Sequence, residues 1–273
     1  MGTLYLVATP IGNLDDISGR ALRVLSQVKL IAAEDTRRTL KLLTHYQIDT
    51  PVTSYFEHNK LSKLPEILAK LGEGDVALVS DAGMPALNDP GYELVRSVLQ
   101  AGYPVSPIPG ASAPIAALVA SGLPTDAFLY LGYLPRKAGE RRLLLSEVAA
   151  LRYSLIFLEA PHRLNEALQD LRSILGNRPI AVARELTKIH EEIFRGTVDG
   201  ALEHFTAQPA RGEITLVVGG ATDQVEKWSE NKLRAEIAGG LAEGYAPAQL
   251  AGRLAAQSGW PRRKIYQVIL NKD

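Results

Sequence analysis

Short apolar runs alternate with segments of helical spacing as far as residue 218. Runs of this kind, bounded by turn-forming residues, are typical of strands buried in a sheet. We expect strands at 4–8, 30–33, 52–56, 76–79, 105–108, 128–131, 155–158, 180–183 and 214–218, and an edge segment at 192–196. Between the strands we expect one helix that begins at residue 18 and further helices at 39–46, 62–71, 92–99, 114–120, 140–150, 163–175 and 198–205. The alternation predicts an α/β fold whose first half has a largely parallel sheet.

The stretch DVALVSDAGMPALNDPG at 75–91 organises this pattern. It predicts a buried strand, a long turn and then a helix with Tyr92, Val95, Val98 and Leu99 on one face. Ligands of open α/β sheets bind beyond the carboxyl ends of the strands, where such turns lie. The turn is thus either part of a ligand site, with Asp81 as an acceptor of hydrogen bonds, or an ordinary loop rich in turn formers.

Two changes of pattern divide the chain. The segment GLPTD at 122–126 predicts a boundary between α/β domains at 1–122 and 123–222. The region 223–273 has no strand candidate and predicts three helices at 232–241, 247–257 and 262–270. Residues 226–273 carry eight Lys and Arg against five Asp and Glu. This small three-helix unit resembles a helix-turn-helix, and a helical cap over a sheet edge is an equal alternative.

Composition narrows the classes of function. The 273 residues have a net charge of zero, so contacts with a polyanion must come from local basic groups. The absence of cysteine excludes disulfides and thiolate metal sites and fits a reducing cytoplasm. The N-terminal residues do not have the pattern of a signal peptide. No run approaches the ~18 apolar residues of a membrane span, so we expect a cytoplasmic protein without a membrane partner.

Several common motifs are missing. The chain has neither a G-x-G-x-x-G after a strand nor a P-loop, and Gly110-Ala111-Ser112-Ala113-Pro114 lacks the second glycine of a nucleophile elbow. The five histidines are scattered and no pair has i, i+4 spacing, so we expect no metal site.

Six turn sequences together carry a resemblance. They are TPIGN at 9–13, AEDTRR at 33–38, SDAGMPALNDPG at 80–91, PGAS at 109–112, LEAPHR at 158–163 and RELTKIHEE at 184–192. In this order and spacing they resemble the tetrapyrrole methylase superfamily of S-adenosylmethionine-dependent enzymes. Within it they resemble the ribosomal RNA small-subunit branch, which methylates a cytidine ribose 2′-hydroxyl. The chain lacks the Gly-rich first loop and the Gly-Asp-Pro central loop usual in tetrapyrrole-acting members, which favours the RNA branch.

The resemblance implies two tandem α/β domains with a cofactor cleft between them. The cofactor it implies is S-adenosylmethionine. The matching cofactor-binding positions in the first domain are Ile11, Ser80, Asp81, Met84, Ser112 and Ala113. Those in the second domain are Leu158, Glu159, Leu186, Glu213, Ile214 and Thr215.

Methyl transfer to a hydroxyl needs positioning and benefits from a base or a nearby cation. The first candidates are Glu34, Asp35 and Arg37, and the second is Lys188, although each could instead serve in salt bridges at the cleft. The basic groups expected to bind RNA are Arg136, Lys137, Arg141, Arg142, Arg262, Arg263 and Lys264.

The partners that follow are small-subunit (16S) ribosomal RNA or the assembled 30S subunit, and the family implies a homodimer. The alternatives are a tetrapyrrole (precorrin-type) methyltransferase and a non-catalytic RNA-binding homologue. The basic tail argues against the first alternative, because a small-molecule enzyme does not need it.

Overall fold

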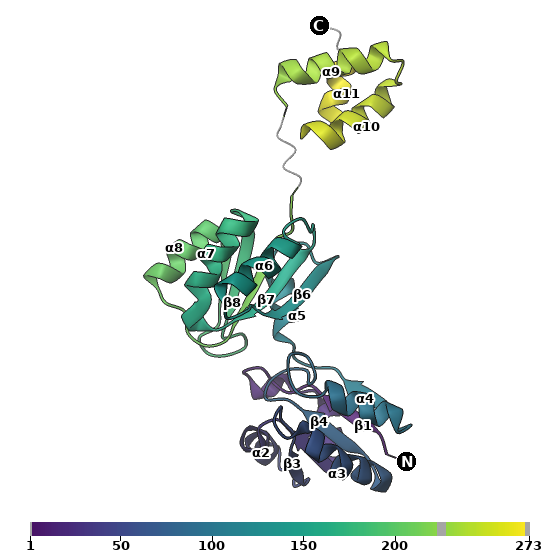
Figure 1. The fold of residues 1–273 in the computed structure, drawn as a ribbon, viewed down its shortest axis with the longest axis vertical. Helices are drawn as coiled ribbons and strands as arrows, with labels where there is room; N and C mark the ends of the chain where they lie inside the picture. Colours follow the sequence, from purple (N-terminus) through teal and green to yellow (C-terminus); the bar gives the residue numbers. More distant parts are fainter. Residues whose placement is uncertain (1, 223–227, 271–273) are drawn as a thin grey trace. The chain divides into compact units, whose positions relative to one another are not determined.

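The computed structural model describes residues 2–222 and 228–270. The chain forms two compact units, Met1–Ala221 and Thr222–Asp273, each of which is described by itself (Figure 1). The domain start expected at residue 223 lies outside the described residues, as do positions 226, 227 and 271–273 of the expected basic tail.

The first unit begins with a parallel five-stranded sheet. Its strands are β1 (Leu4–Val7), β2 (Leu30–Ala33), β3 (Val52–Ser54), β4 (Val76–Val79) and β5 (Val105–Ile108). Their order is β3-β2-β4-β1-β5, and every described pair is parallel. All residues of β2 and β4 are buried, as their uninterrupted apolar runs predict. The carboxyl ends of the strands therefore lie along one edge of this sheet.

Helices cover both faces of this sheet (Figure 1). On one face, Leu25 of α1 (Gly19–Gln27) and Leu43 of α2 (Thr36–His45) share a core cluster. On the other face, Ile67 of α3 (Lys60–Glu73) and Leu94 of α4 (Tyr92–Gln100) share a second cluster. A short 3-10 helix, η1 (Leu14–Asp16), precedes α1. Helix α2 begins earlier than expected, because Asp35 caps it by accepting a hydrogen bond from the Arg37 amide at 2.9 Å.

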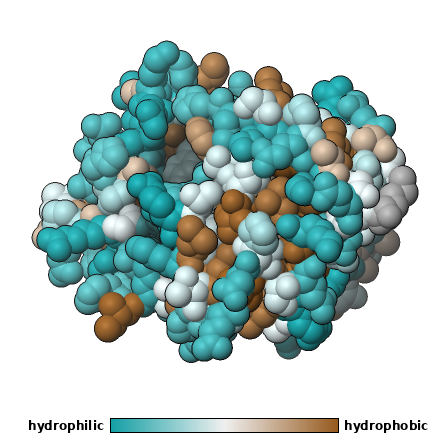
Figure 2. Space-filling model, turned by 90° about the horizontal axis from the view of Figure 1, so that it is seen from below, coloured by the Kyte–Doolittle hydropathy of each residue, from teal (hydrophilic) through white to brown (hydrophobic). Residues whose placement is uncertain are grey.

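The expected apolar face of α4 is confirmed at Val98, which is buried, and at Val95, which packs against the same core cluster, but is wrong at Tyr92 and Leu99. Leu94 and Val98, one turn apart, enter the core, whereas Tyr92 is 66% exposed and Leu99 is 57% exposed. Helical spacing identifies side chains that share a face, but only the contact with the sheet decides which face is buried. Hydrophobic residues are visible at the surface in the view from below, surrounded by hydrophilic ones (Figure 2).

The second sheet is mixed. Its strands are β6 (Phe128–Tyr133), β7 (Ser154–Glu159), β8 (Pro179–Arg184), β9 (Glu192–Thr197) and β10 (Ile214–Val218), in the order β6-β7-β10-β8-β9. Strands β6 and β7 are parallel, and β10 runs antiparallel between β7 and β8. One face packs against α6 (Ala138–Val148), α7 (Leu164–Leu175) and α8 (Val198–Ala207). A 3-10 turn, η2 (Pro161–Arg163), precedes α7.

Helix α5 (Ala113–Ser121) covers the other face of the second sheet. It follows β5 of the first sheet, yet Ala117 and Leu118 pack against Ile156, Ala181 and Val217. Its small residues allow this close approach of helix and sheet. The two α/β halves are therefore joined by packing as well as by chain connection.

The second unit contains α9 (Glu230–Ala242), α10 (Pro247–Ser258) and α11 (Arg262–Leu270). They form a small core of their own, which includes Leu233, Leu250, Leu254 and Ile265. The expected fold class, two α/β halves followed by helices, is confirmed. None of the described helices is long and apolar enough to cross a membrane.

Candidate active site

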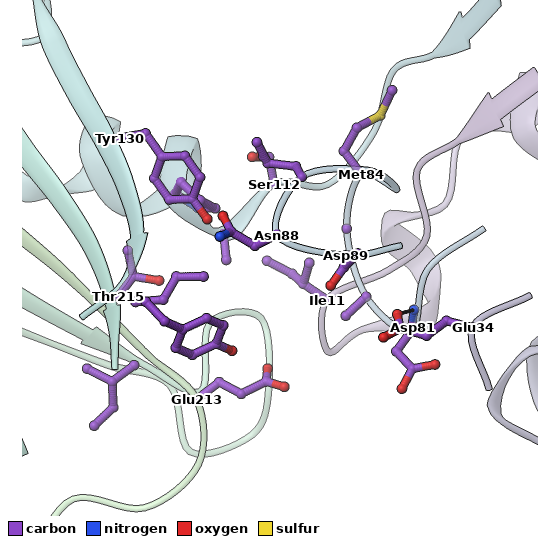
Figure 3. Close-up of a pocket in the computed structure, with 18 of the residues that line it drawn as sticks. Ile11, Glu34, Asp81, Met84, Asn88, Asp89, Ser112, Tyr130, Glu213 and Thr215 are labelled. Carbon is purple, nitrogen blue, oxygen red and sulfur yellow. Dashed lines mark hydrogen bonds between the residues drawn. The ribbon is translucent and has the colours of Figure 1, made fainter. Parts of the chain in front are cut away.

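A cavity of about 250 Å³ lies where the loops after the parallel strands meet the second sheet. Side chains from both α/β halves point toward the hollow (Figure 3). The lining consists of Ile11, Glu34, Arg38, Asp81, Ala82, Gly83, Met84, Leu87, Asn88, Asp89, Ser112, Ala113, Pro114, Tyr130, Tyr133, Leu158, Glu213, Ile214 and Thr215. Its volume is slightly below the range of small-molecule pockets, which is about 300–1,000 Å³.

Backbone hydrogen bonds join the loops that follow β1 and β4. The Thr9 amide donates to the Gly83 carbonyl at 2.9 Å, and the Gly83 amide donates to the Thr9 carbonyl at 3.0 Å. Gly83 has a φ of +81°, which suits glycine because it has no Cβ. The loops are thus fixed against each other before any ligand enters.

Carboxylates join the ends of β2 and β4. The Asp81 amide donates to Glu34 Oε2 at 3.2 Å, and the Asp35 amide donates to Asp81 Oδ1 at 3.1 Å. Arg38 Nη1 lies 3.4 Å from Asp81 Oδ2. Partial burial raises the pKa of Glu34, although the hydrogen bond from the Asp81 amide opposes the increase. The pocket therefore holds a carboxylate whose affinity for a proton exceeds that of an ordinary glutamate.

Asp89 makes the cavity more acidic. Burial, together with the negative charges of Glu34 and Asp81, raises the pKa of Asp89 to about 6. Four carboxyl groups line the cavity, those of Glu34, Asp81, Asp89 and Glu213, against the single guanidinium of Arg38. This charge balance favours a cationic ligand. The described residues contain no group of three or more His, Asp or Glu that could hold a metal ion.

Two tyrosines of the second α/β half form part of the cavity wall. Tyr130 and Tyr133 come from β6, and burial raises the pKa of Tyr130 to about 12 and also raises that of Tyr133. Both phenols are therefore protonated at neutral pH. They can offer hydrogen-bond donors and flat apolar faces to a ligand.

Unusual backbone conformations occur in two loops of the first unit, one of which lines this cavity. The described non-glycine residues with positive φ are Gln47, Ala86, Asn88, Glu185 and Thr187. Ala86 and Asn88 lie in the β4–α4 loop, and Glu185 and Thr187 lie in the β8–β9 loop that contacts Gly12. Such conformations cost about 1–3 kcal/mol each and tend to occur at functional sites.

Most of the cofactor-binding positions expected from the sequence line the cavity. These are Ile11, Asp81, Met84, Ser112, Ala113, Leu158, Glu213, Ile214 and Thr215. Ser80, Glu159 and Leu186 do not line it. Ser80 lines a neighbouring hollow, and Leu186 packs against the core cluster beneath α5.

Glu159 has another role in this structure. Its side chain is fully buried, and Arg163 Nη2 lies 2.9 Å from Glu159 Oε2. The same guanidinium donates to the carbonyls of Leu134 and Pro135. The Glu159 carboxylate thus holds the loop after β6 through Arg163 and does not face the cavity.

Only one of the four catalytic candidates lines the cavity. Glu34 lines the cavity, whereas Asp35 and Arg37 lie outside the lining and pair with each other at 2.7 Å. The hydrogen bonds and charge of Arg37 lower the pKa of Asp35 to about 2. Lys188 is also outside the lining, with Nζ 2.8 Å from Glu185 Oε1 and 3.6 Å from Glu213 Oε2.

The expected RNA contact at Arg141 needs correction. Its side chain is 2% exposed and forms a buried ion pair with Asp170 at 2.6 Å, so it does not reach the surface. Arg136, Lys137 and Arg142 are exposed, although Lys137 pairs with Glu140 and Arg142 pairs with Asp170. In the second unit, Arg262, Arg263 and Lys264 are exposed at the start of α11.

Several lining residues were not singled out from the sequence, and those with polar or aromatic side chains are Arg38, Asn88, Asp89, Tyr130 and Tyr133. Arg38, Asn88 and Asp89 lie within the quoted motifs, so their place after strands could have identified them. The two tyrosines lie on an apolar strand and have no such signal. Only the approach of β6 to the β4–α4 loop shows that they belong to the site.

The chain is similar to a family model and to several named proteins. A family model described as Tetrapyrrole (Corrin/Porphyrin) Methylases matches residues 3–202. The chain is 50% identical to a ribosomal RNA small subunit methyltransferase I of Synechocystis sp., over 100% of this chain and 99% of that one. It is 43% identical to a protein of that name in Bacillus subtilis, over 97% of this chain and 93% of that one. A third relative of the same name, in Thermotoga maritima, is 48% identical over 221 residues, which are 81% of this chain and 99% of that one.

Solved structures share the fold at low identity. A cobalt precorrin-4 methyltransferase is 18% identical with a TM-score of 0.60, and the match covers 80% of this chain and 94% of that one. A uroporphyrin-III C-methyltransferase from Thermus thermophilus, complexed with S-adenosyl homocysteine, is 20% identical with a TM-score of 0.55. That match covers 80% of this chain and 97% of the other.

Proposed function

The chain belongs to the tetrapyrrole methylase family, and on that premise we propose that it transfers a methyl group from S-adenosylmethionine to small-subunit ribosomal RNA. The acceptor that we propose is the ribose 2′-hydroxyl of a cytidine in 16S RNA, as the turn motifs imply. We also propose that the protein is a cytoplasmic homodimer whose domains are 1–122, 123–222 and 223–273, as expected from the sequence.

One observation carries the choice of RNA over a tetrapyrrole. The identity of 50% with a protein named for ribosomal RNA methylation extends over the whole chain, including the C-terminal helices. The likeness to the tetrapyrrole enzymes is a likeness of fold, with identities of 18–20% over 80% of the chain.

The charge and the apolar lining of the cavity suit the cofactor. S-adenosylmethionine carries a sulfonium and an ammonium against one carboxylate, so it is a net cation. Asp81, Asp89 and Glu213 give the cavity the opposite sign. The tyrosines, Ile11, Leu158 and Ile214 supply apolar surface for an adenine ring. Backbone groups of the loops after β4 and β5 are placed to bind the polar parts of the ligand.

When bound, the cofactor supplies a methyl group on a positively charged sulfur, which makes that carbon open to in-line attack. The chain's own residues hold the acceptor and remove its proton. We assign the proton to Glu34, because its carboxylate lines the cavity and has a raised pKa. The hydroxyl proton of the ribose would pass to Glu34 as the methyl group moves from the sulfur to the ribose oxygen.

The neighbouring charges support that role. The Asp81 amide fixes Glu34 Oε2, and Arg38 adds a cation beside the developing negative charge of the ribose oxygen. Asp35 and Arg37 hold the start of α2, from which Arg38 projects. Lys188 is the second candidate, because its ammonium lies within 3.6 Å of the cavity residue Glu213.

The test is methyl incorporation from labelled S-adenosylmethionine into naked small-subunit RNA, 30S subunits and a tetrapyrrole, measured side by side. We expect label in RNA or 30S subunits only. A methylated ribose resists alkaline cleavage on its 3′ side, so partial hydrolysis of the product shows whether the 2′-hydroxyl is the acceptor. Label in the tetrapyrrole alone would overturn the proposed substrate, and cofactor binding without transfer to any acceptor would support a non-catalytic homologue.

A further inference from the structure

Helix α2 presents basic side chains to solvent. Arg37 and Lys41 lie one turn apart on it, and Arg38 lies beside them toward the cavity. All three are exposed, and α2 itself contains no Asp or Glu. We call Arg37, Arg38 and Lys41 the α2 basic stripe. A shallow surface formed by Arg37, Leu40, Lys41 and His45 lies along its outer side.

The stripe borders a hollow that is next to the cofactor cavity. A second hollow of about 140 Å³ is lined by Arg38 and Lys41 from α2 and by Thr9 and Asp81 from the loops after β1 and β4. Arg38 and Asp81 also line the cofactor cavity. The two hollows therefore adjoin each other at Arg38 and Asp81, so a ligand that lies on α2 and enters the second hollow lies beside the cofactor cavity.

Two stripe residues pair with carboxylates, Arg37 with Asp35 and Arg38 with Asp81, but all three side chains of the stripe are exposed, in contrast to the basic group at the start of α6. There, Arg141 is buried, Lys137 pairs with Glu140, and Arg142 pairs with Asp170. Lys41 forms no ion pair with any part of the chain that the structure describes. Within the same residues, Arg37 pairs only with Asp35 and keeps 86% of its side chain exposed. Phosphate contacts require exposed cations of this kind.

We propose that the α2 basic stripe binds the phosphodiester backbone of the RNA beside the nucleotide that enters the cofactor cavity. This inference rests on the proposed function, since it names the surface that holds the same substrate. Arg37 and Lys41 contact phosphates, and the hollow between α2 and the β4 loop leads the target ribose toward Glu34.

Charge reversal with a matched control tests the proposal. Lys41→Glu reverses a stripe residue, and Arg96→Glu makes the same kind of change on α4, which covers the opposite face of the first sheet. Both side chains are exposed, so both variants should melt near the wild-type temperature and bind cofactor equally well. We expect Lys41→Glu to raise the Kd for RNA about tenfold at moderate salt, and Arg96→Glu to leave it near the wild-type value.

The salt dependence of binding gives a second readout. In the double variant Arg37→Gln/Lys41→Gln, the slope of log K against log salt should fall by about 0.7–0.9 for each phosphate that the variant no longer binds. Equal Kd values for Lys41→Glu and Arg96→Glu, together with an unchanged slope in the double variant, would overturn the proposal. The wild-type protein is tested for RNA methylation in the same experiment. If it methylates RNA, this outcome overturns only the role of the α2 basic stripe. If it methylates no RNA at all, the proposed function fails.

Discussion

The backbone amide of Asp81 donates a hydrogen bond to Glu34 Oε2 at 3.2 Å, which joins the ends of two neighbouring parallel strands. The two residues are 47 positions apart in the sequence. The contact orients one oxygen of Glu34 while both side chains face the cavity (Figure 3). It therefore links the loop that lines the cofactor site to the carboxylate to which we assign the proton.

Glu34→Gln tests that assignment. The amide oxygen can still accept the bond from Asp81, but the side chain can no longer take a proton. We expect the single-turnover rate at saturating cofactor to fall by about a hundredfold, with cofactor affinity changed much less. Asp35→Asn is the matched control, because asparagine also caps helices and Asp35 lies outside the cavity lining. A normal rate in Glu34→Gln would make Lys188 the next candidate for the base. An equal loss in Asp35→Asn would show that the rate depends on the whole cluster of Glu34, Asp35 and Arg37.

Asp89→Asn tests the match between an acidic cavity and a cationic cofactor. The pKa of Asp89 is raised to about 6, so the carboxyl becomes protonated as the pH falls through that value. We expect cofactor affinity to fall by up to about tenfold per pH unit below pH 6. The asparagine variant should bind more weakly at pH 7 and lose this dependence. Calorimetry from pH 5 to 8 measures both, and the same pH dependence in the variant would contradict the assignment.

The same substitution should have the opposite effect on stability. A carboxyl whose folded pKa lies above its ordinary value of 3.8 binds protons more tightly in the folded state. The free energy of unfolding of the free protein therefore falls as the pH rises from about 4 to 6. Asp89→Asn removes this penalty and should be more stable at pH 7, by about 1–2 kcal/mol after allowance for solvent screening. Urea unfolding at pH 7 checks the sign.

Glu159→Gln separates a structural role from a role in cofactor binding. Arg163 would remain largely buried without its carboxylate, so we expect the free energy of unfolding to fall by about 3 kcal/mol. Because Glu159 does not line the cavity, the folded variant should retain its affinity for cofactor. Glu159→Gln/Arg163→Met removes both charges and should recover part of the stability. Weaker cofactor binding in a fully folded Glu159→Gln protein would show that Glu159 does take part in cofactor binding.

The C-terminal unit provides another test. Replacement of Arg262, Arg263 and Lys264 by alanine should leave cofactor binding intact and weaken RNA binding. The slope of log K against log salt should fall by about 0.7–0.9 for each phosphate released from these side chains. If the helices are instead a structural cap, the melting temperature falls and RNA affinity declines only with unfolding. Fluorescence titration of RNA at several salt concentrations, beside a thermal melt, decides between the two outcomes.

The sequence by itself determined the helices and strands, and it identified the edge of the first sheet at which the site lies. Continuous apolar runs such as 76–79 predict strands buried on both faces, because only such strands avoid polar residues on either side. Parallel strands end at the same edge, so Asp81 and Ser112 could be expected near one another without a structure. Local chemistry also identified the quoted turns, since their glycine, proline and aspartate residues act within a few positions.

Only the tertiary structure decided which of these side chains face the cavity. Glu34 and Asp35 are neighbours in sequence, yet Glu34 enters the site and Asp35 caps α2, because the chain turns from strand to helix between them. The placement of Tyr130 and the burial of Arg141 likewise depend on contacts between segments far apart in the chain. Periodicity records which residues share a face, whereas the burial of that face depends on the surfaces that pack against it.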